Sequence, residues 1–331
     1  MPISDSRNFG LEALRTAAAA ADLTGRGSLA VSGPDAAELL HGLVTNEVKS
    51  LRPGSGCHAA LLTPKGRMRA ELAVLRVSES EVLLDCDPSL AEPLLGILQG
   101  YVPFSRSVLR DQTSETGVVH LEGPTAAEVL LAAGLPEPAP DDYAHAAGSL
   151  DGVPVRVVRV SRAGEPGFDV RTSPTAVPAL LDLLSSRGAA LVSPDVLEAG
   201  RIEAGLPRWG AELTETTLPN EAGLERTAIS YTKGCYLGQE TVARIRTYGH
   251  VNRRLVALLL PIGCAAAPGD DVRAGEETVG NVTSAVDSSR RAARVALAYV
   301  KKGHDEPGTA LAVATKEGAA AGRVAAVPLG R

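Results

Sequence analysis

The segment with the clearest chemical potential surrounds one cysteine. Residues 233–240 read Lys-Gly-Cys-Tyr-Leu-Gly-Gln-Glu. Gly234 and Gly238 bracket Cys235 and permit backbone conformations that other residues resist. Lys233 supplies a nearby cation, and a helix starting after the second glycine would place the thiol before its positive end. Both influences favour the thiolate, the reactive form of cysteine, although the local pattern leaves a buried structural cysteine open as the alternative.

A second candidate is a glutamate near the end of a predicted helix over residues 194–204, which Gly205 stops. The carboxylate of Glu203 can accept two hydrogen bonds from an aminopyrimidine edge. The small residues Ala199 and Gly200 on the intervening face would let a flat ligand approach the backbone. On spacing alone, an exposed glutamate at a helix end is the stronger reading.

The remaining cysteines and the histidines indicate no further catalytic or metal site. Cys57, Cys86 and Cys264 lack comparable surroundings and are interpreted as structural. No Cys-x-x-Cys pair occurs, so neither a zinc site nor a disulfide scaffold is predicted, and no metal is expected. The six histidines lie in no recognisable catalytic context. The chain also contains no nucleophile elbow, phosphate loop or dinucleotide fingerprint.

Length and composition limit the possible classes of protein. A chain of 331 residues predicts two or three domains. The net charge of -6 and an aromatic content of 3% argue against direct binding of nucleic acid. The N-terminus shows no signal pattern, and the apolar run at residues 17–21 is too short to span a membrane. We therefore expect a soluble cytoplasmic protein with reduced thiols and no membrane partner.

An internal repeat indicates how the elements that carry these residues are built. Residues 31–40 and 121–130 share a Gly-Pro-x-Ala-Ala-Glu pattern, and each copy follows a predicted strand. Glycine permits the sharp turn, and proline suits the first helical turn because its missing N–H is not needed there. The pattern predicts two strand–turn–helix units, each opening one of two related α+β subdomains. Chance recurrence in an alanine-rich chain is the alternative.

The rest of the chain divides by its pattern of turns. Strands are predicted at 59–77, around a basic turn at residues 64–66, and at 81–85, 153–160 and 168–171; helices are predicted at 174–187, 194–204 and 239–245. Beyond residue 250, short strands at 255–260, 278–286 and 295–300 alternate with turns, which is typical of a small barrel or sandwich. We therefore predict an α+β region over residues 1–249 and an all-β domain over residues 250–331.

Taken together, these segments resemble the YgfZ branch of the folate-binding GcvT superfamily, which includes the glycine-cleavage T-protein. Residues 233–240 match the signature of that branch almost letter for letter, and the motif residues are Gly234, Tyr236, Gly238, Gln239, Glu240 and Arg244. The resemblance also covers residues 27–35, 43–46 and 201–205 and a barrel starting near residue 251. It spans nearly the whole chain.

The resemblance implies a duplicated folate-binding body around a hole that holds tetrahydrofolate or a one-carbon derivative, followed by a barrel. It places Glu203 at the pterin-recognising glutamate of the family. It places Cys235 and Lys233 on the functional loop, as candidate catalytic residues. It also implies iron–sulfur assembly or client proteins as partners, among them enzymes that modify tRNA.

One departure bears on the reaction. The aminomethyltransferases of the superfamily carry an Asp-Asp pair after the turn near residue 66, whereas this chain has Ala70 and Glu71. A carboxylate there manages the amine and orients the folate nitrogen. Ala70 therefore argues against the aminomethyltransferase reaction, unless Glu71 replaces the missing carboxylate.

These observations lead to three hypotheses about function. The leading hypothesis is a tetrahydrofolate-binding accessory factor for iron–sulfur protein assembly or repair, with Cys235 as its functional thiol. The alternative is a folate-dependent aminomethyl or methyl transferase of the T-protein type. The third is a folate-gated adaptor that performs no chemistry. The sequence leaves open whether the protein is an enzyme.

Overall fold

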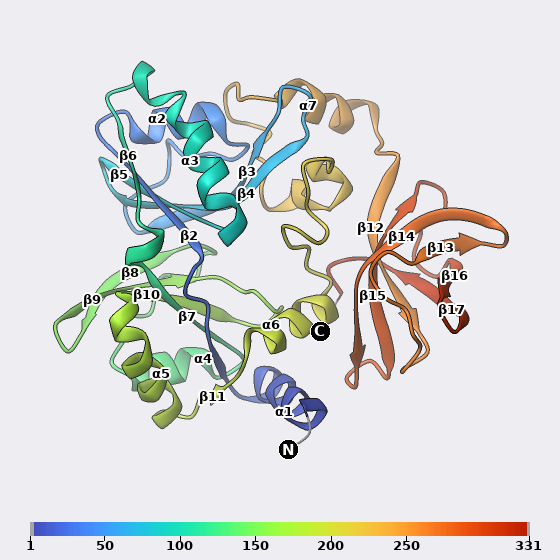
Figure 1. Cartoon of the computed structure of the whole chain (residues 1–331). Coiled ribbons are helices and arrows are strands. Elements are labelled where there is room, and N and C mark those ends of the chain that lie inside the picture. The colour runs from blue at the N-terminus through green and yellow to red at the C-terminus, as the bar shows by residue number, and fades with distance from the viewer. Residues whose placement is uncertain (1–2, 330–331) are drawn as a thin grey trace. The chain divides into compact units, whose positions relative to one another are not determined.

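The computed structural model describes residues 3–329, and Figure 1 shows their arrangement into sheets, helices and a barrel. The chain forms two compact units that do not follow chain order. The first contains the described residues up to Leu62, together with Arg69–Leu197 and Thr227–Leu237. The second contains Thr63–Met68, Glu198–Arg226 and the chain from Gly238 onward. The predicted division at residue 250 stays a prediction.

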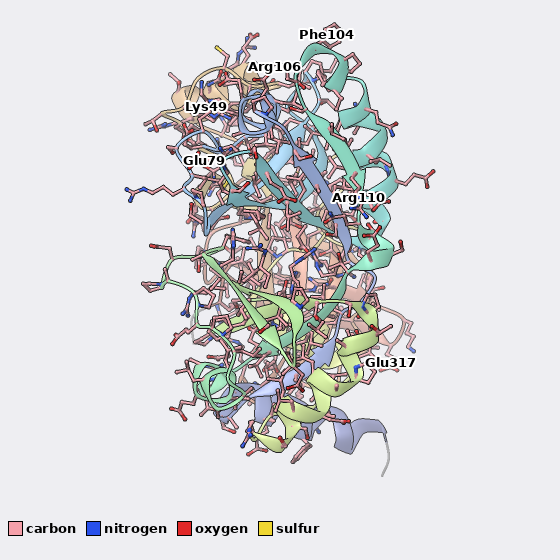
Figure 2. All side chains as sticks on the ribbon, turned by 90° about the vertical axis from the view of Figure 1, so that its left-hand side faces the viewer. Lys49, Glu79, Phe104, Arg106, Arg110 and Glu317 are labelled. Carbon is pink, nitrogen blue, oxygen red and sulfur yellow. The ribbon has the colours of Figure 1, made fainter. Side chains whose placement is uncertain are left out.

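A five-stranded sheet forms one half of the first unit, in the order β3-β4-β5-β2-β6. Its strands are β2 (Gly27–Ser32), β3 (Ser55–Leu62), β4 (Met68–Ser78), β5 (Glu81–Cys86) and β6 (Val108–Asp111). Helices α2 (Ala36–Leu43) and α3 (Ala91–Gln99) pack beside it (Figure 1). At the edge strand β6 and the segment before it, Phe104, Arg106 and Arg110 lie at the surface, as Figure 2 shows.

A six-stranded sheet forms the other half of the first unit, in the order β11-β1-β7-β10-β9-β8. Its strands are β1 (Ala19–Asp22), β7 (Gly117–Glu122), β8 (His145–Leu150), β9 (Val153–Arg159), β10 (Gly167–Thr172) and β11 (Ala190–Leu191). The helices α4 (Ala126–Ala132) and α5 (Val177–Ser186) pack on it, and α1 (Ile3–Thr16) precedes it. Their apolar faces bury a core that includes Leu121, Leu130, Phe168 and Leu180.

The predicted repeat is confirmed as two strand–turn–helix units, β2 to α2 and β7 to α4. Each turn requires its glycine. Gly33 has a φ of +125° and Gly123 a φ of +137°, in the left-handed region that side chains disfavour. A Cβ at Gly33 would lie 2.1 Å from the carbonyl oxygen of Arg106, and one at Gly123 would lie 2.4 Å from that of Ala17. The glycines therefore let neighbouring backbone pass close to both turns.

A buried group of charged side chains connects the two sheets of the first unit. The carboxylate of Asp85 on β5 accepts hydrogen bonds from Arg26 (2.5 Å), from Arg171 on β10 (2.6 Å) and from Arg162 (3.3 Å). Burial by itself raises the pKa of Asp85, but the three guanidinium groups outweigh it and lower the pKa to about 2. Arg171 also donates to Ser28 Oγ on β2 at 2.7 Å, so the two sheets share a fully paired polar contact.

A histidine extends this group on β7. Nδ1 of His120 lies 2.7 Å from Asp169, and Nε2 lies 2.5 Å from Glu122. Burial lowers the pKa of His120, but the bonds to both carboxylates outweigh burial and raise it. Glu122 also accepts the backbone N–H groups of Arg162 at 2.7 Å and Glu165 at 2.8 Å. Its carboxylate thus fixes the loop that carries Arg162 toward Asp85.

The second unit contains a closed six-stranded barrel in the order β12-β15-β14-β13-β16-β17. The strands are β12 (Arg253–Leu260), β13 (Asp271–Ala274), β14 (Glu277–Ser288), β15 (Ala293–Lys301), β16 (Ala310–Thr315) and β17 (Gly318–Ala325). Its apolar interior includes Leu258, Val272, Val300 and Val313. The predicted all-β fold of this part is confirmed, and the structure identifies it as a barrel.

Two helices outside the sheets carry predicted site residues. Helix α6 (Pro194–Ala204) has the predicted bounds, and α7 (Gln239–Tyr248) is three residues longer than predicted. Over the described part of the chain, none of the helices combines the length and the apolar character needed to cross a bilayer.

Candidate functional site

Cys235 is the exposed member of the four free cysteines. Burial raises the pKa of the Cys57 thiol to about 12, and that of the Cys86 thiol also to about 12. Both therefore remain protonated at neutral pH. Only a thiol that reaches solvent and ionises can attack a partner. Cys235 thus meets the requirement of access, while its functional role stays a prediction.

Lys233 makes hydrogen bonds that could not be predicted from its place in the sequence near Cys235. Its Nζ donates to the carbonyl oxygens of His41 (2.5 Å), Val44 (2.7 Å) and Asn46 (2.9 Å). An ammonium group has three N–H donors, so all three are used on backbone carbonyls. The Nζ also lies 5.1 Å from the centroid of the Tyr236 ring. Lys233 therefore anchors the loop before Cys235 to the end of α2 and to the chain that follows it.

Burial lowers the pKa of Lys233 to about 8, and the carboxylate of Glu47 opposes this shift. At neutral pH most of the side chain is still an ammonium. A charged group can remain buried when polar partners satisfy it, and the three carbonyl oxygens do so here. The three hydrogen bonds tie the ammonium group to the backbone, while the catalytic role of Lys233 stays a prediction.

Further hydrogen bonds join the same two segments. Thr45 Oγ1 donates to the carbonyl of Ala228 at 2.5 Å, and the N–H of Ser230 donates to the carbonyl of Thr45 at 3.0 Å. Asn46 Nδ2 donates to the carbonyls of His58 (2.8 Å) and Thr227 (3.0 Å). Residues 227–233 thus lie along residues 44–46. The loop that carries the thiol is held at several points before it reaches Cys235.

The motif residues from Gly238 onward lie in the second unit. Gly238 has a φ of +85° at the N-terminus of α7, a conformation that favours glycine. Gln239 begins the helix, and Glu240 pairs with Arg244 at 2.8 Å one turn later. The side chains of that pair are 82% and 68% exposed, so solvent screens it and it adds little to stability.

Glu203 is buried near the end of α6, with 6% of its surface exposed. Its backbone carbonyl accepts from Arg291 Nε at 3.3 Å, and the carbonyl of Ala204 accepts from the N–H of Leu329 at 2.8 Å. The end of the helix is thus held by the barrel and by the chain after it. The alternative of an exposed helix-end glutamate is wrong, because the residue is buried.

Glu71 forms a contact that sequence analysis missed. Side chains alternate along β4, so Ala70 is fully buried whereas Glu71 lies on the opposite face. Oε1 of Glu71 lies 2.9 Å from Nε2 of His58, and Nδ1 of His58 lies 3.1 Å from Thr227 Oγ1. The ring of Tyr143 stacks on the imidazole at a centroid distance of 5.9 Å. His58 and Glu71 are 13 positions apart in the sequence, and no local pattern predicts their contact.

Comparison with known proteins agrees with this architecture. The GCVT N-terminal domain matches residues 4–233, and the glycine cleavage T-protein C-terminal barrel domain matches residues 253–329. A crystal structure of the glycine cleavage system aminomethyltransferase T from Bartonella henselae superposes with a TM-score of 0.87 and 23% identity, covering 97% of this chain and 89% of that one. The fold is therefore that of glycine cleavage T-proteins.

Sequence relatives define the family. A putative chloroplastic transferase of Arabidopsis thaliana is 30% identical over 90% of this chain and 68% of its own length. An aminomethyltransferase of Streptomyces coelicolor is 30% identical over 90% of this chain and 82% of its own. The chain belongs to the GcvT family. The predicted superfamily is confirmed, while assignment to the YgfZ branch stays a prediction.

Tetrahydrofolate is the cofactor that aminomethyltransferases of this family use, so the predicted cofactor is confirmed for the family. The chain has a group that suits it. Glu203 offers two carboxylate oxygens in a buried setting, and the aminopyrimidine edge of a pterin presents N–H donors that such a group accepts. The residue type and its burial therefore fit the cofactor. That Glu203 is the group that holds it stays a prediction.

Proposed function

We propose that this protein is a tetrahydrofolate-binding accessory factor for the assembly or repair of iron–sulfur proteins, with Cys235 as its functional thiol and Glu203 as its pterin ligand. The observation that carries the proposal is an exposed thiol on a loop anchored by a buried lysine. The match of residues 233–240 to the YgfZ signature supports it. In this proposal the protein acts in the cytoplasm and supports iron–sulfur enzymes that modify tRNA.

The thiol would act with a partner. Clusters generally take four protein ligands, and one exposed cysteine supplies a single ligand. Among the residues that the structure describes, no group of three or more His, Cys, Asp or Glu side chains is arranged to hold a metal ion. A redox, carrier or cluster-contacting role at the surface of an assembly or client protein therefore fits the thiol better than stable cluster binding by this chain.

The test is the activity of an iron–sulfur tRNA-modifying enzyme in a deletion strain carrying the wild type or a variant. Cys235→Ser and Glu203→Ala are each expected to reduce rescue to near the level of the deletion. Cys264→Ser, which removes a half-buried thiol of the second unit, is expected to rescue fully. Full rescue by Cys235→Ser would reject the thiol role. If Glu203→Ala still failed in that case, a folate-gated adaptor would be favoured.

The second candidate is a folate-dependent aminomethyl or methyl transferase. It is favoured by relatives named aminomethyltransferase at about 30% identity, and by Glu71, which offers a carboxylate beside the buried Ala70. If this function holds, the purified protein should form methylene- or methyl-tetrahydrofolate from an aminomethyl or methylated substrate. Glu71→Gln should then abolish turnover, while Cys235→Ser should leave it unchanged. The reverse pattern of sensitivity would exclude this candidate.

A further inference from the structure

The loop that carries the thiol passes beside an imidazole of the first unit. His41 lies in the last turn of α2, and its backbone carbonyl accepts the hydrogen bond from Lys233 Nζ described above. Its side chain lies beside the next residue of the loop, because a Cβ at Gly234 would be 3.9 Å from Nε2 of His41. The imidazole is therefore next to the backbone one residue before Cys235.

The other nitrogen of this imidazole faces a carboxylate. Nδ1 of His41 lies 3.2 Å from Oε1 of Glu47, and the N–H of Ser50 donates to the same oxygen at 3.2 Å. The N–H of Val48 also points at Nδ1, but at 3.5 Å, the outer limit of a hydrogen bond. A carboxylate only accepts hydrogen bonds, and its charge makes the contact the stronger one. We therefore assign the proton of the neutral ring to Nδ1, which leaves the lone pair on Nε2.

The surroundings of His41 keep it able to accept a proton at neutral pH. Burial lowers the pKa of His41, the ammonium group of Lys233 lowers it further, and the carboxylate of Glu47 opposes both. The neutral ring is therefore the main form at pH 7. Two further charges act on the ring, those of Lys49 and Glu38, but they pair with each other at 2.5 Å. Among the residues that the structure describes, none forms a hydrogen bond with Nε2.

Neither backbone conformation nor close packing requires a glycine at position 234. Gly238 has a φ of +85°, whereas the φ of Gly234 is not in the left-handed region. A Cβ at Gly234 would meet Nε2 of His41 at an ordinary van der Waals distance. A side chain longer than that of alanine would, however, fill the space next to Nε2. The glycine therefore leaves the imidazole open toward the loop that carries Cys235.

We propose that Nε2 of His41 accepts the proton of the Cys235 thiol, and that Glu47 is a positioning residue that orients the ring. The S–H bond breaks, the proton moves to Nε2, and the electron pair stays on sulfur as a thiolate. The imidazolium then directs its Nδ1–H at Glu47, and it lies at the C-terminal end of α2, where a helix favours positive charge. The proposal rests on the functional thiol proposed above and names the base that activates it.

The first test measures the rate at which iodoacetamide alkylates Cys235 in the full-length protein at pH 7, by mass spectrometry of the peptide that contains it. The thiolate displaces iodide, so the rate follows the fraction of thiolate. Because a free cysteine is only a few per cent thiolate at this pH, loss of the base in His41→Gln should slow the reaction by about tenfold. Glu47→Gln should slow it less. His304→Gln, in the turn after β15, is the control and should react like the wild type.

Two further measurements separate proton transfer from a change in the fold. The substitutions at His41 keep the backbone carbonyl that binds Lys233, and urea unfolding identifies the conditions under which each variant is folded. Added imidazole should restore the rate in His41→Ala and leave the wild type unchanged. Gly234→Val should slow alkylation in the wild type but not slow His41→Gln further, because the valine acts by covering Nε2.

A folded His41→Gln that reacts as fast as the wild type would overturn the proposal, as would a His41→Ala whose slow reaction imidazole does not restore. The deletion-strain assay separates the proposal from the function on which it rests. Full rescue by Cys235→Ser would reject the thiol function, while the alkylation rates would still decide whether His41 takes the proton. Normal alkylation and full rescue in His41→Gln would reject the proposal and leave the function of Cys235 standing.

Discussion

Replacing Asp85 by asparagine is expected to lower the free energy of unfolding by about 3–5 kcal/mol. Asp85 is buried and accepts hydrogen bonds from Arg26, Arg162 and Arg171. Removing one member of a buried ion pair leaves the remaining charges uncompensated, and the amide cannot replace the lost negative charge. Urea unfolding of the purified protein at pH 7 measures the change. A loss well below this range would mean that the three guanidinium groups find other partners.

An exposed ion pair offers a matched control. Asp35 also has a pKa lowered to about 2, first by hydrogen bonds from Arg106, and Arg106 lies at the surface in Figure 2. The side chain of Arg106 is 77% exposed and that of Asp35 is 29% exposed. Solvent screens such a pair. Asp35→Asn is therefore expected to cause a clearly smaller loss than Asp85→Asn, although the two carboxyl groups have similar pKa values.

The same substitution predicts a dependence on pH. The pKa of Asp85 is lowered from 3.8 to about 2 on folding, so its ionised form stabilises the folded state. This contribution is fully present above pH 3.8 and is lost as the pH falls through about 2. It amounts to roughly 2.5 kcal/mol. The difference in unfolding free energy between wild type and Asp85→Asn should therefore shrink over this interval. A difference that stayed constant from pH 5 to pH 2 would contradict the assignment of the shift to Asp85.

The helices, strands and turns predicted correctly from the sequence are those marked by residues within or next to the element. The two Gly-Pro turns and the strands before them were found because a tight turn restricts the residues that can form it. Helix α6 was found with its exact bounds, since its glycine stop lies next to it in sequence. The strands that pair as β9 and β10 were predicted from their β-branched residues. In each case, the physics that shapes the element acts over a few residues.

Helices and strands that contain residues unfavourable to their own secondary structure were not predicted. Helix α3 contains Pro93 and Gly96, which argue against a helix, yet proline is tolerated in the first turn, where its missing N–H is not needed. Helix α1 contains Gly10, whose Cβ would lie 2.8 Å from a methyl carbon of Val196. Close packing of the helix therefore selects a residue with low helix propensity. The strands β16 and β17 are rich in alanine and glycine, and pairing within the closed barrel decides their structure.

Candidate site residues could be named from the sequence where their side chains mark them, but contacts formed by backbone atoms could not. Cys235 and Glu203 carry side chains with recognisable chemistry, so they could be named as candidates, and their roles stay predictions. The partners of Lys233 are carbonyl oxygens, which every residue possesses, so no sequence pattern marks them. The contact between His58 and Glu71 depends on the pairing of β3 with β4, because only that pairing brings the two positions together on one face.

Replacing Lys233 by methionine is expected to lower the free energy of unfolding by about 3 kcal/mol, because one buried and two partly buried carbonyl groups lose their donor. Lys233→Arg tests whether charge alone is enough. Arginine keeps the positive charge but presents a planar fork instead of three N–H groups around one atom. It should therefore also destabilise the protein. Lys316→Met, at an exposed position in the turn between β16 and β17, should leave the unfolding free energy nearly unchanged.

The role of Lys233 toward the thiol is separable from its role in stability. Because its three N–H groups are already bonded to carbonyl oxygens, Lys233 has none left to donate to a thiolate of Cys235. Under conditions where the variants are folded, the rate of alkylation of Cys235 by iodoacetamide at pH 7 is expected to be similar in Lys233→Met, Lys233→Arg and wild type. A rate that fell in Lys233→Met, but not in Lys233→Arg, would assign the lysine to stabilising the thiolate. An unchanged rate together with lower stability in both variants would make Lys233 an anchor, and the reactivity of Cys235 would then depend on how the loop presents it to a partner.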